Sequence, residues 1–533
     1  MARIPSRRAF VKNTAAWIAV AQAARWVDLL AADAPSAIAT TSSGRIRGTV
    51  NAGINVFKGV PYGGPTGGKN RFMLPVKPVP WTDVRDALAY GPTAPQALTR
   101  PPRGVPAEGE DCLVLNVFTP ALGTGRRPVM VWLHGGGFST GSGSTAILEG
   151  SNLARTGDVV VVTINHRLNV FGYTYVGDEG GGDFALSGAA GMLDIIAALE
   201  WVRDNIDRFG GDPNLVTIFG QSGGGRKVAT LMAMPKAKGL FHRTIIESGA
   251  VLRLTQKADA VQITEMLMAE LGLARGQVRQ LQEVPMDRLL AAYAAISPRV
   301  PVREPGQTAN SPTVDGTAIP GHPWDPAAPS LSANIPLLIG WARTEETLYD
   351  RPTPETLALD EAGLHKRARA RLGEDPARVI SAYRAVHPTL TPWDLWILIA
   401  TDHPRGTYSR ETAKRKAAQK AAPAYLYRFD WETPEDGGHM RSPHTVEIQF
   451  VFNNIAIAGP LISKMPEAYD LATKVSASWV AFARTGNPNV PGLPTWPAYG
   501  TATRDTMLFN NESRVTQDPD GAARVAMEQV LKL

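Results

Sequence analysis

The stretch Leu215-Val216-Thr217-Ile218-Phe219-Gly220-Gln221-Ser222-Gly223-Gly224-Gly225 decides the fold. Its first five residues are apolar or β-branched and predict a strand that is buried on both faces. Residues 227–234, which follow, are compatible with a helix. A serine between a strand and a helix, with a glycine two places before it and two places after it, is typical of a nucleophile held at a sharp turn. Ser222 is therefore the candidate nucleophile.

A second copy of the same short pattern occurs at Gly137-Phe138-Ser139-Thr140-Gly141. The chain contains 51 glycines, so about one chance match to a G-x-S-x-G pattern is expected. This match follows a glycine-rich loop and has no helix signal directly behind it. We therefore expect Ser139 to be a structural residue.

Short apolar runs without polar alternation recur along the chain. Residues 129–133 and 159–164 have this composition, which is typical of strands in a parallel sheet covered on both faces. Between Gly188 and Phe209 apolar residues recur at three- and four-residue steps, which predicts an amphipathic helix. Together with the strand at 215–219, these segments predict a βαβ unit and an α/β fold with a central, mostly parallel sheet flanked by helices.

The rest of the chain extends this α/β pattern with large insertions. The predicted segments are strands at 335–339 and 424–429, helical insertions at 253–300 and 354–400, and Pro-rich loops at 92–106 and 301–329. A length of 533 residues alone suggests about three domains. Because no repeat or low-complexity linker divides the chain, we instead predict one large domain over residues 35–533.

A second glycine cluster, His134-Gly135-Gly136-Gly137-Phe138, directly follows the strand predicted at 129–133. Glycines expose backbone amides without side-chain obstruction, and an attack on an ester carbonyl needs N–H donors that are already in place. The cluster has the form of the HGGG-type loop of lipases and esterases. A dinucleotide-binding loop is disfavoured, because the cluster opens no helix and lacks the G-x-G-x-x-G spacing.

The N-terminus has the layout of a twin-arginine export signal. Ser6-Arg7-Arg8-Ala9-Phe10-Val11-Lys12 precedes a mildly apolar stretch from Ala15 to Ala24. Cleavage after Ala23 or near Ala34 would remove the signal. We predict that residues 1–34 engage the twin-arginine export machinery transiently and that the mature protein is periplasmic or secreted; the alternative is a basic terminus leading into a first helix.

Composition excludes several classes of protein. With 44% hydrophobic and 20% charged residues the chain is an ordinary globular protein, and no charge-free apolar run approaches the ~20 residues that a membrane span needs. The net charge of +6 falls to +3 without residues 1–34, which contain five basic and two acidic residues, so no nucleic-acid partner is indicated. The one basic run, Lys414-Arg415-Lys416, is expected to be a solvated helix face. The single cysteine, Cys112, has no cysteine partner for a disulfide or a metal site.

Several further motifs, taken with the two glycine clusters, carry a family resemblance. They are Phe57-Lys58-Gly59-Val60-Pro61-Tyr62, Glu110-Asp111-Cys112-Leu113-Val114-Leu115-Asn116, Phe209-Gly210-Gly211-Asp212-Pro213, and Phe482-Ala483-Arg484-Thr485-Gly486-Asn487-Pro488. In this order and spacing the chain resembles the type-B carboxylesterases, a family of α/β-hydrolases that includes bacterial p-nitrobenzyl esterases and cholinesterases. The resemblance runs from about Ser43 to Phe509 and implies the α/β-hydrolase fold and cleavage of carboxylic esters.

The resemblance also implies a catalytic triad in the chain order serine, acid, histidine. The family's acid lies five residues beyond a strand-ending glycine, here Gly340, which indicates Glu345 and leaves its neighbour Glu346 as the rival. The family's histidine opens an H-x-x-E segment, which His444 does, whereas His439 is expected in a loop. In this scheme His444 takes the proton of Ser222 and Glu345 orients the imidazole.

Similarity to the family assigns the oxyanion hole to the N–H groups of Gly136, Gly137 and Gly223, and it requires no metal or organic cofactor. Three positions depart from the family pattern. Gln221 stands where many relatives have Glu, Gly223 replaces a common Ala and is expected to loosen the turn, and Ala94 occupies the place of a cysteine that often pairs with the equivalent of Cys112. Ser248 resembles a serine near the histidine, although an ordinary serine at the end of a strand fits equally well.

Three functional hypotheses remain open from the sequence. The first is a serine esterase acting on a small-molecule ester without stable membrane insertion. The second is a catalytically silent binding protein on the same fold, which normally lacks a member of the triad. The third is an acyltransferase using the same serine, which product analysis with added alcohol would reveal. Trp324, Trp341, Trp393 and Trp396 are expected in the core, and the oligomeric state is left open.

Overall fold

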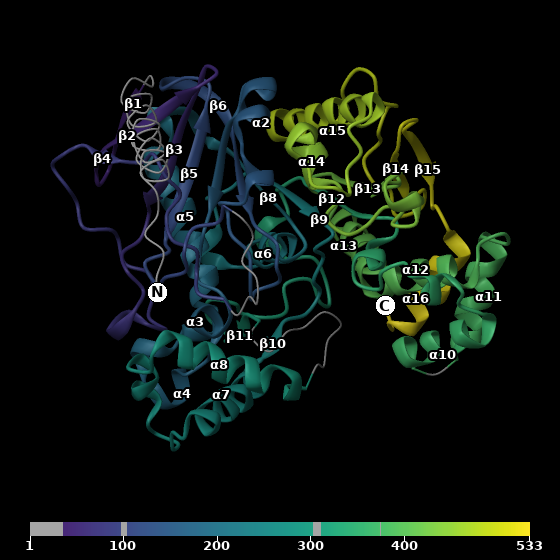
Figure 1. The fold of residues 1–533 in the computed structure, drawn as a ribbon, viewed down its shortest axis with the longest axis horizontal. Helices are drawn as coiled ribbons and strands as arrows, with labels where there is room; N and C mark the ends of the chain where they lie inside the picture. Colours follow the sequence, from purple (N-terminus) through teal and green to yellow (C-terminus); the bar gives the residue numbers. More distant parts are fainter. Residues whose placement is uncertain (1–35, 97–103, 302–310, 374) are drawn as a thin grey trace, which may run out of the picture.

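The computed structural model describes residues 36–96, 104–301, 311–373 and 375–533, so the export signal predicted for residues 1–34 lies outside the described residues. Within the described ranges, thirteen strands form one sheet and two short strands pair separately (Figure 1). The strands of the main sheet are β1 (Ser36–Thr41), β2 (Gly44–Asn51), β3 (Ile54–Pro61), β4 (Arg85–Asp86), β5 (Val114–Thr119), β6 (Gly123–Leu133), β7 (Val160–Ile164), β8 (Phe209–Gln221), β9 (Arg243–Glu247), β12 (Leu337–Ala342), β13 (Ala424–Phe429), β14 (Asp505–Phe509) and β15 (Arg514–Gln517). The small sheet pairs β10 (Thr255–Gln256) with β11 (Thr313–Val314).

The main sheet has a parallel centre and antiparallel edges. Its strand order is β1-β2-β3-β5-β7-β6-β8-β9-β12-β13-β14-β15, with β4 beside β2. All neighbours from β7 to β14 run parallel, whereas the pairs from β1 to β7 and the pair β14–β15 are antiparallel. The predicted mostly parallel sheet is confirmed. The predicted βαβ unit is corrected in one respect, because β6 lies between β7 and β8, which are not neighbours.

Helices cover both faces of the sheet and form two outlying groups. They are α2 (Ser151–Gly157), α3 (Asn169–Tyr173), α4 (Gly177–Gly180), α5 (Ala190–Asn205), α6 (Gly223–Leu231), α7 (Lys257–Leu271), α8 (Met286–Ile296), α9 (Pro354–Leu357), α10 (Glu361–Leu372), α11 (Pro376–Val386), α12 (Pro392–Thr401), α13 (Thr407–Ala418), α14 (Ile448–Val451), α15 (Pro466–Thr485) and α16 (Gly521–Val530). The predicted helical insertions correspond to α7–α8 and α9–α12, which lie beside the sheet in separate groups with apolar clusters of their own (Figure 1).

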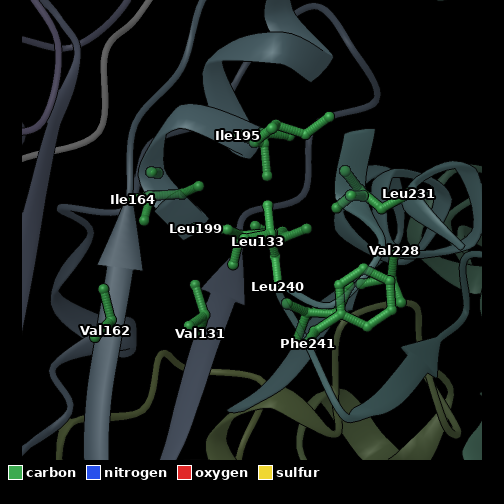
Figure 2. Packing of buried hydrophobic residues seen from close by; sticks show 14 of the residues in the cluster. Val131, Leu133, Val162, Ile164, Ile195, Leu199, Val228, Leu231, Leu240 and Phe241 are labelled. Atoms are coloured by element: carbon green, nitrogen blue, oxygen red, sulfur yellow. The ribbon is translucent and has the colours of Figure 1, made fainter. Parts of the chain in front are cut away.

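The main core follows from the alternation of side chains along the central strands. Successive residues of a strand point to opposite faces, so β6 directs Val131 and Leu133 to one face and Trp132 to the other. On the first face, Figure 2 shows Val131 and Leu133 packed with Leu199 of α5 and Val228 of α6. On the second face, Trp132 joins side chains of α2, α14 and α15. Continuous apolar runs in β6 and β7 are therefore required by two covered faces.

The helix α5 is buried on nearly every side and is not simply amphipathic as its spacing predicts. By length and composition, Gly182–Arg208 is long and apolar enough to cross a membrane, but most of it is buried inside the protein. Met192 and Asp194, two residues apart and therefore on opposite sides of the helix, are both buried. This burial is that of a core helix of the α/β fold.

The basic run 414–416 on α13 is not the solvated face that the sequence predicts. Lys416 is fully buried, and its Nζ donates hydrogen bonds to the carbonyl oxygens of Ser332 at 3.0 Å and Ala333 at 2.6 Å. Arg415 donates to the carboxylate of Glu411 at 2.6 Å. The run therefore anchors α13 to the segment that precedes β12, because a buried ammonium must be hydrogen-bonded.

Candidate active site

The predicted site residues gather at the carboxyl ends of the parallel strands. Ser222 follows β8, the glycine cluster follows β6, Glu345 follows β12, and His444 lies in the connection after β13. Parallel strands bring their carboxyl ends to one edge of the sheet, which is where α/β proteins place their ligands. The topology thus brings together segments that are up to 310 residues apart in the chain, from His134 to His444.

Ser222 occupies a strained turn between β8 and α6. Its φ of 57° and ψ of −120° lie in a region that residues other than glycine rarely adopt. Its N–H donates to the carbonyl oxygen of Glu247 at 2.7 Å, which ties the turn to β9. A Cβ on Gly224 would lie 1.9 Å from the carbonyl oxygen of Leu133, so this glycine allows α6 to approach β6. The turn leaves the Ser222 side chain partly exposed.

His444 and Glu345 form a buried hydrogen-bonded pair. The exposed fraction of the side chain is 2% for His444 and 0% for Glu345. His444 Nδ1 donates to Oε2 of Glu345, and the backbone N–H of His444 donates to the Glu345 carbonyl oxygen at 3.3 Å. The other carboxylate oxygen of Glu345 accepts from the N–H of Ala342 at 2.8 Å. These bonds leave His444 Nε2 as the ring nitrogen that can act as a base.

Glu346, the rival acid next to Glu345 in the chain, pairs with two arginines. Its carboxylate accepts from Arg405 at 2.6 Å and from Arg371 at 3.1 Å. Of the two candidate acids, Glu345 is the one that contacts His444. Arg405 in turn lies 4.9 Å from the ring of Tyr349, whose ring centroid is 5.5 Å from that of His444.

Burial and charge act in opposite directions on the His444–Glu345 pair. Burial lowers the pKa of His444 below its ordinary value of 6.5, although the carboxylate of Glu345 opposes this change. Burial alone would raise the pKa of Glu345, but the charge and hydrogen bond of His444 hold that pKa below its usual range. The pair is therefore set for a neutral imidazole beside an ionised carboxylate at neutral pH.

The contact between the nucleophile turn and His444 runs through Gln221. Its Nε2 lies 3.3 Å from Nδ1 and 3.4 Å from Nε2 of the His444 ring. Because Nδ1 carries the hydrogen that it donates to Glu345, only Nε2 has a free lone pair, and an atom nearly equidistant from both nitrogens does not lie along it. The amide therefore rests against the imidazole. Within the described ranges Ser222 Oγ makes no hydrogen bond. In free enzymes the hydrogen bond between the nucleophile and the catalytic base is often long or poorly aligned, and it tightens only when substrate binds.

The glycine cluster forms a loop, here called the oxyanion loop (residues 134–137), that packs against the nucleophile turn. Gly136 and Gly137 have φ of 88° and 63°, which favour glycine. Among the residues that the structure describes, the N–H groups of Gly136, Gly137 and Gly223 have no acceptor. A Cβ on Gly223 would lie 2.1 Å from the carbonyl oxygen of Gly137, so glycine at 223 permits close contact with the loop.

Several buried groups lie beside the site, and apart from Ser248, for which the sequence left two interpretations open, they were not predicted as site residues. Ser248, at the end of β9, donates to Glu447 at 2.9 Å, and burial raises the pKa of Glu447 well above its usual range. Burial raises the pKa of Glu247 to about 8, and its carboxyl accepts from the indole N–H of Trp479 at 2.8 Å. The Glu-Ser-Gly sequence at 247–249 and the glutamate of H-x-x-E, Glu447, are the sequence signals for them. Lys227 was missed as well, and no local sequence signal indicates its role.

The remaining sequence predictions concern structural residues. Ser139 Oγ lies 3.0 Å from the hydroxyl of Tyr293, and His439 is exposed in a loop, as expected. Cys112 is a buried free thiol, and burial raises its pKa. The four tryptophans Trp324, Trp341, Trp393 and Trp396 are buried in the core. Across the described ranges no group of three or more His, Cys, Asp or Glu side chains could hold a metal ion.

A serine at a strand-to-helix turn, beside a buried histidine–glutamate pair at the same edge of a mostly parallel sheet, defines a serine hydrolase of the α/β-hydrolase fold. The carboxylesterase family model matches residues 35–375 and 397–527. A para-nitrobenzyl esterase of Bacillus subtilis is 37% identical over 495 residues, which cover 91% of this chain and 97% of that protein. The phenmedipham hydrolase of Pseudarthrobacter oxydans is 33% identical over 89% of this chain and 95% of its own.

Solved structures agree with the sequence relatives. A crystal structure of a carboxylesterase from Geobacillus stearothermophilus superposes with a TM-score of 0.81 at 37% identity, covering 92% of this chain and 99% of that one. The chain belongs to the carboxylesterase family and hydrolyses carboxylic esters as a serine hydrolase.

Proposed function

We propose that this esterase hydrolyses small to medium carboxylic esters through a Ser222–His444–Glu345 triad and an acyl-enzyme intermediate. The hydrogen bond from His444 Nδ1 to the buried carboxylate of Glu345, at the edge of the sheet that carries Ser222, is the observation that supports this assignment best. It fixes the tautomer in which Nε2 is free to accept a proton.

The reaction proceeds in two halves. His444 Nε2 takes the proton of Ser222 Oγ as the oxygen forms a bond to the ester carbonyl carbon, and the carbonyl π electrons move to the oxygen. The oxyanion collapses, the bond to the alkoxy oxygen breaks, and His444 gives its proton to the departing alcohol. Water then attacks the acyl-enzyme with the same proton transfers, which releases the carboxylic acid and restores Ser222.

The oxyanion of each tetrahedral intermediate is stabilised by the N–H groups of Gly136, Gly137 and Gly223. Their donors are in place before the reaction, so no reorganisation is required as negative charge develops. Glu345 stabilises the imidazolium that exists between the two proton transfers. The scheme uses only groups of this chain and needs no metal or organic cofactor.

Turnover of p-nitrophenyl esters from acetate to decanoate by the protein lacking residues 1–34 tests the proposal. Ser222→Ala should lower kcat by about 10³–10⁶-fold, because it removes the nucleophile. Ser139→Ala is the matched control, since it changes the serine of the other G-x-S-x-G pattern and should keep the wild-type rate. Equal rates for Ser222→Ala and the unchanged protein would show that another group is the nucleophile. The chain-length optimum reports the size of the acyl pocket.

We also propose that residues 1–34 direct export by the twin-arginine route to the periplasm or the medium. The Arg7-Arg8 pair, followed by Phe10 and Lys12, supports this proposal. Replacing both arginines by lysine keeps the charge and should retain the esterase in the cytoplasm, as should expression in a strain without the twin-arginine translocase. Fractionation followed by an esterase assay measures the distribution. Unchanged export in both cases would contradict the proposal.

A further inference from the structure

Lys227 is a buried cation on the helix that follows the nucleophile. It lies on α6, five residues after Ser222, and it is 0% exposed. An ammonium group removed from water has to be hydrogen-bonded. Its Nζ donates to the carbonyl oxygens of His134 and Gly137, both at 2.9 Å. The side chain thus reaches from the nucleophile helix to the oxyanion loop.

These two carbonyl groups lie at the two ends of the oxyanion loop. The inner carbonyl groups have partners of their own: His134 Nδ1 donates to Gly135 at 2.9 Å, and the N–H of Thr140 donates to Gly136 at 3.0 Å. In a trans peptide the N–H points away from the C=O of the same unit. The bonds to the Gly135 and Gly136 carbonyls therefore direct the N–H groups of Gly136 and Gly137, which share their peptide units, away from these partners. The ammonium group of Lys227 anchors the loop at its two ends.

The charge of Lys227 has no counter-ion. In the ranges that the structure describes, no acidic side chain pairs with it, and burial lowers its pKa to about 7. The groups that face it are Arg226 on its own helix, the stacked rings of His134 and His166 from the loops after β6 and β7, and the ring of Phe138 at 5.7 Å. Burial lowers the pKa of both histidines far enough to keep them neutral. The positive charge thus faces the oxyanion loop uncompensated.

A second buried lysine, Lys416, separates a role in the fold from a role in the reaction. Lys416 is also fully buried and also donates to two backbone carbonyl oxygens, those of Ser332 and Ala333. Those acceptors belong to a segment without candidate site residues, so Lys416 serves the fold alone. The acceptors of Lys227 belong to the loop that carries Gly136 and Gly137. A cation in this low-dielectric place favours a negative charge on the other side of the loop.

We propose that Lys227 is a positioning residue of the esterase reaction, whose ammonium group fixes the oxyanion loop and favours the oxyanion formed when Ser222 attacks the ester. This inference rests on the proposed triad mechanism. The ester carbonyl oxygen is neutral in the ground state and gains negative charge only in the transition state. Lys227 therefore acts on kcat far more than on KM.

Lys227→Met tests this proposal, because methionine keeps the length of the side chain and removes its charge and its donors. Kinetics with p-nitrophenyl butyrate are measured at pH 6.5, together with the affinity for an aryl trifluoromethyl ketone, which adds to the serine as a tetrahedral adduct. We expect kcat to fall by about 10–100-fold with KM changed by less than about 2-fold. Affinity for the ketone should fall by the same factor as kcat/KM. Lys227→Arg, which keeps the charge, should recover part of kcat.

Two controls make the outcome decisive. Lys416→Met removes the matched buried lysine and should lower the unfolding temperature without changing kcat. Ser222→Ala is run in parallel: if it loses activity while Lys227→Met keeps the wild-type kcat, only the role of Lys227 is overturned, and if Ser222→Ala is fully active, the triad assignment fails as well. An equal loss of kcat in Lys416→Met, or unchanged affinity for the ketone, would also overturn the role. If Lys227→Met does not fold, Lys227→Leu, which also lacks the charge and the donors, takes its place with the same expectation.

Discussion

At the scale of single residues, the base His444 sets the lower limit of the working pH range. Burial lowers its pKa below 6.5, and only the neutral imidazole accepts the proton of Ser222. We therefore expect the acid limb of kcat/KM to fall as the pH is lowered through that reduced pKa. A profile of kcat/KM against pH measures the midpoint. A midpoint well above 6.5 would contradict the effect of burial.

The partner of His444 gives a second prediction at this scale. Glu345→Gln removes the negative charge that stabilises the imidazolium, so the pKa of His444 should fall further and the acid limb should move to lower pH. The rate should drop by about 10³–10⁴-fold, as for other triads that lose their acid. Glu346→Gln is the control, because Glu346 pairs with Arg405 and does not contact His444. Equal profiles for Glu345→Gln and the unchanged enzyme would assign the acid elsewhere.

Gly223 is predicted to be intolerant of even a methyl group. A Cβ there would lie 2.1 Å from the carbonyl oxygen and 2.4 Å from the nitrogen of Gly137, so Gly223→Ala should displace the oxyanion loop. We expect kcat to fall about 10-fold or more and stability to fall by about 1–3 kcal/mol. Gly321→Ala, where a Cβ would meet open space, should leave both unchanged. Kinetics and urea unfolding measure these effects, and a fully active Gly223→Ala would contradict the contact.

The sequence predicts residues that belong to local motifs, and it fails for side chains whose partners are remote. Ser222 and His444 stand in patterns that can be read within about ten residues, and Glu345 is placed by its distance from Gly340. The acceptors of Lys227 lie about 90 residues earlier in the chain, and those of Lys416 about 80 residues earlier. A buried lysine has the same local sequence as a solvated one, because its burial depends on the tertiary structure.

At the scale of elements, the buried ion pair between Arg167 and Asp194 joins the loop after β7 to helix α5. The two side chains are 1% and 0% exposed, and Arg167 Nη2 lies 2.6 Å from the carboxylate. Asp194→Asn should cost about 3–5 kcal/mol of stability, because it leaves the guanidinium buried without its charge partner. Asp204→Asn, on the same helix but in an exposed pair with Arg203, should cost less than about 1 kcal/mol. Urea unfolding compares them, and equal losses would contradict a role for burial.

The prediction of elements succeeds where a strand or helix is long and apolar. Strand β7 and strand β13 were predicted within one residue of their observed bounds, because their sides face two apolar layers. The antiparallel strands β1 to β3 were not predicted. Exposed residues alternate with buried ones in much of β1 and β2, and half-buried residues interrupt the buried ones in β3, so none of the three is a continuous apolar run. Strand β8 begins at Phe209, six residues before the predicted start, because backbone pairing continues across glycines that carry no hydrophobic signal.

At the scale of the whole molecule, the site depends on strand order that periodicity does not reveal. Strands β6, β8, β9, β12 and β13 are consecutive neighbours, so the segments that follow them meet at one edge. Apolar runs predict that these strands are buried but not which strands are adjacent. The assignment of Glu345 and His444 came from resemblance to a family, in which the same order had already been established. The sheet explains why residues so far apart in the chain contact each other.

The predicted export signal gives a final test at this scale. The main sheet begins at Ser36, and all candidate site residues lie beyond it, so removal of residues 1–34 should leave kcat/KM within about 2-fold and the unfolding temperature unchanged. Removal of residues 1–41 is the matched control, because it also deletes β1, which pairs with β2 and buries Ala37 and Ala39. This longer deletion should lower the unfolding temperature. If removal of residues 1–34 already lowers the unfolding temperature, these residues belong to the folded protein and not to a removable signal.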